Sequence, residues 1–521
     1  MMKENKAVKW ILEHENLLEA LLMMFLPLLC CLVTCALEGQ SIGRVYLPAS
    51  EWNDELFYYK QVEGIVHYGY PQGYFGFNES HAMKLSFAAW SPVLVWPWIL
   101  WGLVFGWNFH SPIYCNIFLM MAAMFGFVLL AKPTRKQLGL LTLMFVTFTP
   151  FTRYMLSGMP EVICFAMVIL TFSLGVSYLR REHAAKLVIL FVMTGVMTLM
   201  RPYLIVFMLL PVYFLVRKRK WLGLLISVII AGAAGAGYIG IKYYLGADYF
   251  APLFDTTWVT AFRDVGIFGG VKYMLYRLWT EGRLFMAMLV EAFISGLAAG
   301  ARFAGFIWIM LLLFWQAFVS GRKKEKQGLV LNLFLAVCFF GMWMALLLMY
   351  KMDEGSKHLL TFTAAGMFAV CLMKTKFYKK TIVTAALFAY LYIAMANNAY
   401  EYQIPYYTEE RAGQVAAWEE IFDRELSVDR ENTPSFDNVV VWVFSDIGEK
   451  EAECTPWQYL YALPEGFGIS CCMWDYTTQN FEDLQSRYLA VTLEGTVEQM
   501  CVEKGLRLVG RSGGMAVYEL R

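Results

Sequence analysis

Long apolar runs separated by short basic clusters make up most of the chain between residues 16 and 397. The first run, at about 16–37, is long enough to cross a bilayer, and no small-residue cleavage site follows it. We interpret it as a retained membrane helix and not as a cleaved signal peptide. Together with the later runs it predicts about eleven crossings. The later runs lie near 115–131, 138–150, 161–179, 187–200, 202–216, 222–245, 303–320, 328–350, 358–373 and 381–397.

Basic clusters between these runs predict the orientation of the helices. The positive-inside rule places all six clusters, and with them the N-terminus, on the cytoplasmic side of the cell membrane. An even number of crossings must then separate neighbouring clusters. The clusters are Lys3/Lys6/Lys9, Lys132/Arg135/Lys136, Arg180/Arg181/Lys186, Arg217 to Lys220, Arg322/Lys323/Lys324/Lys326 and Lys374/Lys376/Lys379/Lys380.

Two apolar stretches do not cross the membrane under this parity. Between residues 37 and 132 only one inward crossing is allowed, and the run 115–131 supplies it. The stretch 90–107 carries five Trp and two Pro residues. Because Trp favours the membrane–water interface, we expect an interfacial or re-entrant helix pair there. The stretch 284–300, which contains Glu291, is expected to be a juxtamembrane element or part of one long tilted helix.

Polar sequence marks two regions outside the predicted bundle. The outer loop, 38–90, is long where short connections are usual. In residues 401–521 strand-like runs alternate with a helix-like segment, which predicts a small extracytoplasmic α/β domain. Residues 1–400 are expected to form the membrane module, including the outer loop 38–90 and the interfacial segment 90–107. The runs of the C-terminal region are 439–444, 488–492, 497–504, 506–509 and 515–520.

The composition agrees with an α-helical polytopic membrane protein. Of the 521 residues 59% are apolar and 16% are charged, whereas soluble domains average about 25% charged residues. Mean hydropathy is +0.50. A net charge of +1 without a basic stripe gives no case for a nucleic-acid partner. Seven of the 11 Cys residues lie in apolar runs and are expected to be packing residues. The other four can include a disulfide if they face an oxidising compartment; they are Cys454, Cys471, Cys472 and Cys501.

Ionisable residues gather in the predicted outer loops, where the adjacent carboxylates Asp54 and Glu55 follow the first helix. Taken singly, each residue has a structural explanation. The acidic pair can be solvated loop charges, Glu161 can cap a helix, and the cations can reach from the interface to water. Their convergence on one face favours a functional site, because ionisable groups near membrane depth are costly. The set is Asp54, Glu55, Glu161, Arg201, Lys357 and His358.

The remaining candidates lie in the outer loop. Glu79 and His81 are candidate ligands for a divalent cation, although two ligands do not make a site. Lys84 is placed to meet a lipid phosphate or a generic anionic headgroup. His81 is also a candidate substrate-binding residue. Tyr58 belongs to a group of tyrosines that can line a sugar or acceptor groove.

These residues resemble, in order, the motifs of the GT-C superfamily of polyprenyl-phosphate-sugar-dependent glycosyltransferases. The likeness is to the protein O-mannosyltransferase and aminoarabinose-transferase branch, which is glycosyltransferase family 39-like, and it covers roughly residues 15–400. Three positions depart from the family pattern: one Pro replaces a pair, Glu161 replaces Asp, and Lys357-His358 replaces Arg. The matching motifs are Asp54-Glu55 with Tyr58-Tyr59, Ser91-Pro92-Val93-Leu94, Glu161, Arg201-Pro202 and Lys357-His358-Leu359-Leu360.

The resemblance implies a GT-C-like fold and an inverting sugar transfer from a polyprenyl-phosphate donor to a glycan, lipid or protein acceptor. Asp54 would be the general base, with Glu55 as its reserve, and Glu161 would hold the acceptor, a cation or the geometry of the base. Lys84, Arg201 and Lys357 would stabilise the leaving phosphate. Such an enzyme needs Asp54 and Glu161 to face a shared outer cavity that opens to lipid. The alternatives are a transporter or lipid flippase, whose charges would lie near the midplane, and a catalytically silent member of the same fold.

Overall fold

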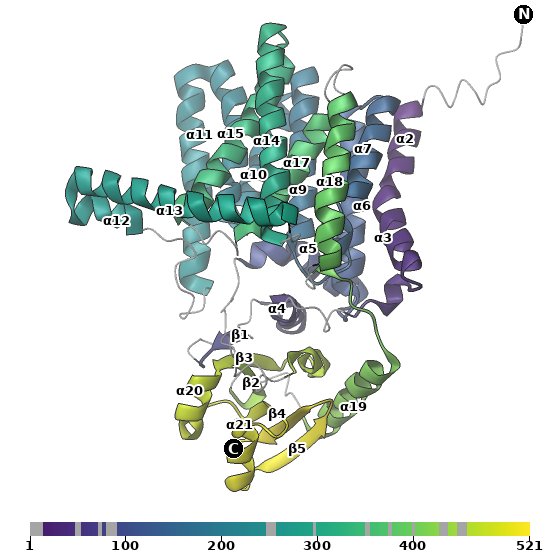
Figure 1. Cartoon of the computed structure of the whole chain (residues 1–521), viewed down its shortest axis with the longest axis vertical. Helices are drawn as coiled ribbons and strands as arrows, with labels where there is room; N and C mark the ends of the chain where they lie inside the picture. Colours follow the sequence, from purple (N-terminus) through teal and green to yellow (C-terminus); the bar gives the residue numbers. More distant parts are fainter. Residues whose placement is uncertain are drawn as a thin grey trace, which may run out of the picture.

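The computed structural model consists of a helical bundle with a β-sheet at one of its ends (Figure 1). Apolar runs of membrane length form the bundle, as their hydropathy predicts. The described residues are 14–46, 54–70, 75–79, 91–245, 257–294, 298–349, 355–372, 378–398, 402–426, 436–444 and 456–521.

Seven helical stretches among these residues are long and apolar enough to cross a membrane. They are Glu15–Leu37, Ser111–Ala131, Glu161–Arg180, Pro202–Leu245, Ala298–Arg322, Lys326–Met349 and Lys379–Asn397. In the order of the chain the bundle helices are α2 (Glu15–Met24), α3 (Leu26–Leu37), α6 (Ser111–Ala131), α7 (Arg135–Thr147), α9 (Glu161–Arg180), α10 (Ala184–Met200), α11 (Leu209–Leu245) after η4 (Pro202–Met208), α14 (Ala298–Arg322), α15 (Lys326–Met349), α17 (Leu359–Cys371) and α18 (Tyr378–Asn398).

The stretch Pro202–Leu245 is two helices and not one. Lys220 has φ 47° and ψ −123°, so the chain reverses there, and the predicted basic cluster Arg217 to Lys220 lies at the reversal. When the two halves count separately and the shorter α7, α10 and α17 are added, the described helices agree with the predicted crossings near eleven. The fold class expected from the sequence is therefore confirmed: a polytopic helical membrane protein with a small C-terminal α/β region.

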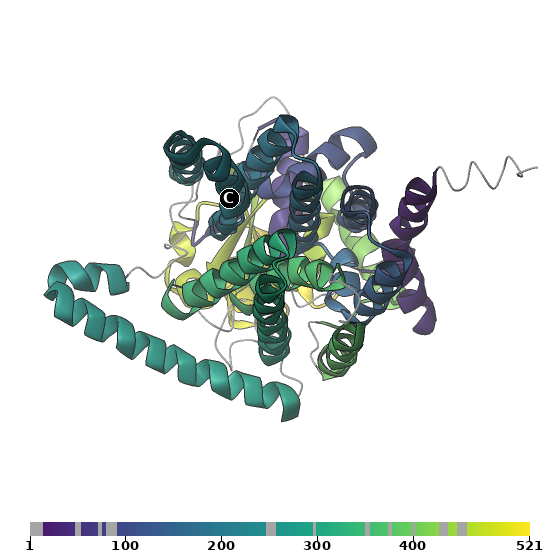
Figure 2. The ribbon, with the colours of Figure 1, turned by 90° about the horizontal axis from the view of Figure 1, so that it is seen from above.

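Helices other than those of the bundle lie at the sheet end and beside the bundle. The Trp-rich stretch forms η3 (Pro92–Val95) and α5 (Trp96–Phe105). A ten-residue helix measures about 15 Å, half of a hydrocarbon core, so α5 does not cross on its own. The stretch with Glu291 belongs to α13 (Gly266–Ile294), which runs across the bundle together with α12 (Thr257–Asp264) (Figure 1). Figure 2 shows this teal pair as an arm beside the bundle.

The sheet has six strands in the order β1-β3-β2-β4-β6-β5. The four neighbouring strands β1, β3, β2 and β4 are parallel, and β6 is antiparallel to β4 and β5. The strands are β1 (Phe75–Phe77), β2 (Val439–Phe444), β3 (Gly468–Met473), β4 (Tyr488–Thr492), β5 (Arg507–Ser512) and β6 (Met515–Glu519); the helices of this region are α19 (Glu409–Glu425), α20 (Trp474–Gln479) and α21 (Thr496–Glu503), with short 3-10 turns η8 (Phe436–Asn438), η10 (Trp457–Ala462) and η11 (Phe481–Asp483).

The sheet is joined to the bundle through the outer loop. Its strand β1 comes from that loop and pairs with β3, so that Phe75 is the partner of Ile469. One face of the sheet, including Trp442, shares a continuous core with the bundle, and Phe57 of the loop helix packs on Trp442 with ring centroids 5.7 Å apart. The opposite face packs a second core beneath α21. Among the described residues no disulfide joins Cys471, Cys472 and Cys501, and Cys454 lies outside those residues.

Candidate functional site

The two adjacent carboxylates stand at the start of α4 (Asp54–Tyr68), a helix that the sequence did not predict. Acidic side chains in a first turn are favourable, because the helix dipole places partial positive charge there. Glu55 is fully buried, and its Oε1 accepts a hydrogen bond of 2.8 Å from the backbone N–H of Gly158. Glu55 therefore ties α4 to the turn before α9.

Asp54 differs from its neighbour because its side chain is 42% exposed. Its Oδ2 lies 3.0 Å from Nζ of Lys357, in the short helix η5 (Ser356–His358). Burial lowers the pKa of Lys357, but the carboxylates of Asp54 and Glu161 outweigh it and raise that pKa above its ordinary value. Lys357 is therefore a persistent cation, 29% exposed, that lies within electrostatic reach of both carboxylates.

Glu161 and Arg201 form a second ion pair that is wholly buried. Oε1 of Glu161 lies 2.7 Å from Nη2 of Arg201, with the two side chains 0% and 1% exposed. Glu161 is the first residue of α9, and Arg201 caps the C-terminal end of α10 just before Pro202, so two helix ends place them. Burying such a pair demands good geometry, because each ion loses its hydration.

Further hydrogen bonds to Arg201 extend this pair. Its Nη1 donates to the hydroxyl of Tyr203 at 3.1 Å and lies 2.9 Å from Nδ1 of His358. Guanidinium nitrogens only donate, so Nδ1 of His358 accepts and carries no proton. Oε2 of Glu161 is buried and accepts no hydrogen bond from the described residues. The network thus links α9, α10, η4 and η5 around one guanidinium.

Arg302 and Ser356 belong to this region but were not identified from the sequence. Arg302, in the first turns of α14, donates to the hydroxyl of Ser356 at 2.8 Å and to the hydroxyl of Tyr402 at 3.0 Å. It is 7% exposed. Ser356 directly precedes Lys357, so Arg302 holds the turn that carries Lys357. A lone Arg at the start of an apolar run was the signal available in the sequence, because such a charge is costly there.

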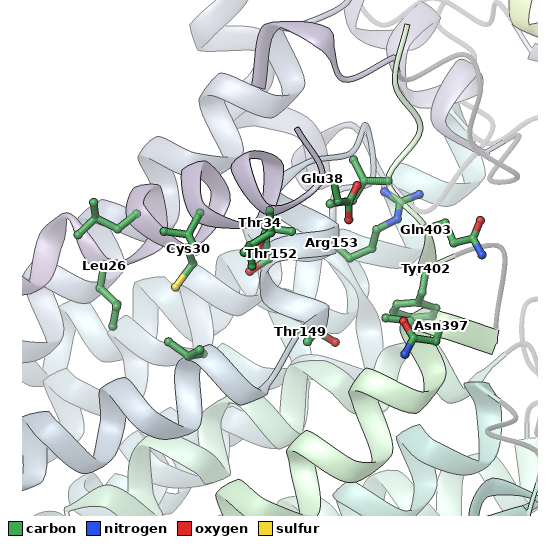
Figure 3. Close-up of a pocket in the computed structure, with 16 residues that line it drawn as sticks. Leu26, Cys30, Thr34, Glu38, Thr149, Thr152, Arg153, Asn397, Tyr402 and Gln403 are labelled. Atoms are coloured by element: carbon green, nitrogen blue, oxygen red, sulfur yellow. The ribbon is translucent and has the colours of Figure 1, made fainter. Parts of the chain in front are cut away.

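Tyr402 also lines a cavity of about 680 Å³ between α3, α7, α8 (Pro150–Met155) and the end of α18 (Figure 3). Leu29, Val33 and Leu37 on its wall are 53%, 55% and 83% exposed, so the cavity opens on the apolar outer surface of the bundle. Its polar end holds Arg153 and Glu38 (Figure 3). Neither Asp54 nor Glu161 lines this cavity, so it is not the shared, lipid-facing cavity that the sequence-based hypothesis requires. Tyr402 and Arg302 stand between it and η5.

The outer-loop candidates lie apart from this cluster or outside the described residues. Both carboxylate oxygens of Glu79 accept backbone hydrogen bonds, from Gln485 at 2.7 Å and from Ser486 at 2.8 Å. His81 and Lys84 lie outside the described residues. Within the parts that the structure describes, no group of three His, Cys, Asp or Glu residues is placed to hold a metal. Tyr58 is 4% exposed and lies within electrostatic reach of Arg201.

Part of the sequence that forms this site is similar to a known protein family. Residues 90–237, which include Glu161 and Arg201, match the family model described as dolichyl-phosphate-mannose-protein mannosyltransferase. This match confirms the resemblance to GT-C glycosyltransferases over that segment. No curated protein matches the sequence.

Two crystal structures of ArnT from Cupriavidus metallidurans are similar over most of the chain. The apo structure is 9% identical with a TM-score of 0.40, and the match covers 99% of each chain. The structure bound to undecaprenyl phosphate is 10% identical with a TM-score of 0.41, covering 96% of this chain and 97% of that chain.

Proposed function

We propose that this protein is an integral membrane glycosyltransferase that moves a sugar from a polyprenyl-phosphate donor to an acceptor hydroxyl at the sheet end of the bundle. The Asp54–Lys357 pair carries the proposal. It sets a partly exposed carboxylate 3.0 Å from a cation at the end of membrane helices. Such a transfer requires two charged groups: a carboxylate that acts as general base and a cation that stabilises the leaving phosphate. The family match over residues 90–237 supports the same class of reaction.

Asp54 is the proposed general base. It takes the proton of the acceptor hydroxyl while the oxygen attacks the anomeric carbon from the face opposite the phosphate. The bond between that carbon and the phosphate oxygen breaks, and the configuration inverts. Glu55 is less suited to this role, because it is fully buried and already accepts a backbone hydrogen bond.

Lys357 is the proposed partner of the leaving phosphate. Without a donor it pairs with Asp54; a donor phosphate that draws Lys357 away leaves the carboxylate free to accept a proton. Polyprenyl phosphate then departs with a negative charge that the ammonium stabilises. Arg201 is less accessible, at 1% exposed, and is held by Glu161 and His358. We assign Glu161, Arg201 and His358 the task of positioning η5 and its lysine.

The acceptor is a glycan, a lipid or a protein, and the sheet beside α4 offers a surface to hold it. The cavity of Figure 3 supports a lipid-borne substrate, because it opens on the apolar face of the bundle. Hydrogen bonds from Arg302 to Tyr402 and to Ser356 connect its wall to η5. A transporter is the second candidate function. Movement of the lipid across the bilayer without formation of a glycosylated product would favour it. The charged groups described here lie at helix ends and not within helices, which favours the enzyme.

Asp54→Asn in the full chain, reconstituted in liposomes with polyprenyl-phosphate hexoses and pentoses, tests the proposal. We expect release of polyprenyl phosphate to fall about 10²- to 10⁴-fold, the usual effect of losing a general base. The free energy of unfolding should fall by no more than about 1 kcal/mol, because the lost ion pair is partly exposed. Asp475→Asn, in the first turn of α20, is the matched control and should retain activity. Full activity in Asp54→Asn, or donor lipid that crosses the bilayer without sugar transfer in the wild type, would contradict the proposal.

A further inference from the structure

A second cavity, of about 430 Å³, lies at the end of the bundle opposite the charged site. It is formed where α15 begins and where α9 and α14 end. Helix α9 starts at Glu161 and ends at Arg180, which lines this cavity. Its 20 residues rise about 1.5 Å each, so Arg180 lies about 30 Å along the helix from Glu161. The proposed sugar transfer makes no use of it.

Cations surround this cavity. Arg180, Lys324 and Lys326 line it, and none of them forms an ion pair with a carboxylate among the described residues. Glu325 also lines it and supplies one opposing charge. Because Lys326 is the first residue of α15, the partial positive charge of that helix end adds to the excess. Three cations against one carboxylate leave an excess of positive charge, which favours an anionic ligand.

Gln316 indicates that the ligand also carries a hydrogen-bond donor. It lines the cavity, is 6% exposed, and its Oε1 is buried without a hydrogen-bond donor among the described residues. An orphaned buried acceptor costs free energy unless a ligand or water satisfies it. A fully ionised phosphate offers no donor to this oxygen, whereas a phosphate ester with a free hydroxyl does. Ser320, one turn further along α14 and 2% exposed, provides a second hydroxyl partner.

Apolar side chains complete the wall and indicate where the ligand comes from. Phe172, Val176 and Leu331 line the cavity on helices that cross the membrane. A headgroup pocket with apolar walls at the ends of membrane helices suits a phospholipid whose chains remain in the bilayer. From the cations, the orphaned amide oxygen and these walls, we propose that the cavity binds the phosphoglycerol headgroup of an anionic phospholipid. The phosphate meets Arg180, Lys324 and Lys326, and a glycerol hydroxyl donates to Gln316.

Native mass spectrometry of the full chain with added lipids tests this assignment. We expect phosphatidylglycerol to bind in preference to phosphatidylcholine. Arg180→Gln or Lys324→Gln should weaken the binding of phosphatidylglycerol about tenfold, since each removes a charge-assisted hydrogen bond. The adjacent cations that do not line the cavity give matched controls: Arg181→Gln and Lys323→Gln should change the affinity less than about twofold.

Phosphatidylmethanol, which has the same charge and no headgroup hydroxyl, isolates the role of Gln316. The wild type should prefer phosphatidylglycerol to it, and Gln316→Leu should not distinguish the two lipids. Equal losses in the lining variants and their controls would overturn the proposal in favour of general surface attraction. Displacement of the lipid by glycerol 3-phosphate at the same concentration would overturn the lipid assignment in favour of a soluble phosphate ester. Equal binding of phosphatidylcholine would exclude an anion site altogether.

Discussion

Asp54 and Glu55 are adjacent in the sequence, but they occupy different environments. Successive residues of a helix point about 100° apart, so α4 turns Glu55 into the bundle and leaves Asp54 partly exposed beside Lys357. The sequence grouped Asp54 with Lys357, and the structure pairs them at 3.0 Å, while their catalytic role stays a prediction. The sequence could not predict the direction of each side chain, because that depends on the rotation of α4 between two packed surfaces.

At the residue scale, Lys357→Gln should lower kcat/KM for the polyprenyl-phosphate donor about 10²- to 10³-fold, the usual loss for one electrostatic contact to a developing charge. Asp54 then keeps its carboxylate but the leaving phosphate loses its cation. Steady-state kinetics in liposomes measure the change. Lys357→Arg keeps the charge and should recover part of the rate. If Lys357→Gln left kcat/KM unaltered, a cation other than Lys357 would stabilise the phosphate.

Glu63 gives a prediction about pH. Burial raises the pKa of this α4 carboxyl to about 7, against the opposing charge of Lys60, whose Nζ lies 2.7 Å from it. A carboxyl with a raised folded pKa binds more protons when folded, so its contribution to stability is complete below about pH 4.5 and is lost as pH rises toward 7. Melting of Glu63→Gln and of the wild type from pH 5 to 8 should therefore show Tm of the variant improving relative to the wild type as pH rises. A constant difference would contradict the shift.

At the scale of elements, the turn after β1 docks the outer loop on the sheet. Asn78 and Glu79 both have positive φ, at 50° and 55°, which costs L-residues free energy. Their hydrogen bonds offset that cost: the backbone of Asn78 donates to Cys471 at 2.9 Å, and Glu79 accepts from two backbone amides. The conformation therefore persists because of the sheet.

Glu79→Gln should weaken this docking by about 1–3 kcal/mol, because an amide presents its NH₂ group to one backbone donor and leaves it unsatisfied. Hydrogen exchange should become faster in β1 and in the β3 edge that pairs with it, while the bundle helices keep their protection. Glu482→Gln, which removes the charge of a side chain that is 73% exposed, is the control and should leave exchange unchanged. Equal protection of β1 in wild type and Glu79→Gln would show that β1 alone supports the loop.

The elements differ in how far the sequence predicted them. Strands β2, β4 and β6 fall on apolar runs rich in β-branched and aromatic residues, and were expected. Helix α21 falls on the segment that was expected to be helical. Strand β3 reads Gly468 to Met473 with two Cys residues, which have no strong strand preference, and β1 has only three residues. Helix α4 is buried by the bundle on one side and the sheet on the other, so it lacks the one-sided apolar pattern that predicts a helix.

At the scale of the whole molecule, the orientation in the membrane remains our prediction. Cysteines introduced as Arg219→Cys and Lys323→Cys should react with an impermeant maleimide only from the cytoplasmic side, and Asp475→Cys only from the outside. Arg219 lies at the reversal of α11, so its labelling also tests whether that stretch crosses twice. The described native thiols are buried or half-buried, and Cys454→Ser removes the remaining one. Labelling of all three from one side would contradict the topology.

The strand that the outer loop gives to the sheet has a consequence for biosynthesis. Asn78 bonds to Met473, 395 residues later, so at about 5–20 residues per second the loop emerges on the order of 20–80 s before its partner. During that interval the strands against which α4 packs have not all been synthesised. A chain that stops before β3 lacks the strand on which β1 docks, and we expect proteases to cut its outer loop faster than that of a chain that contains β3.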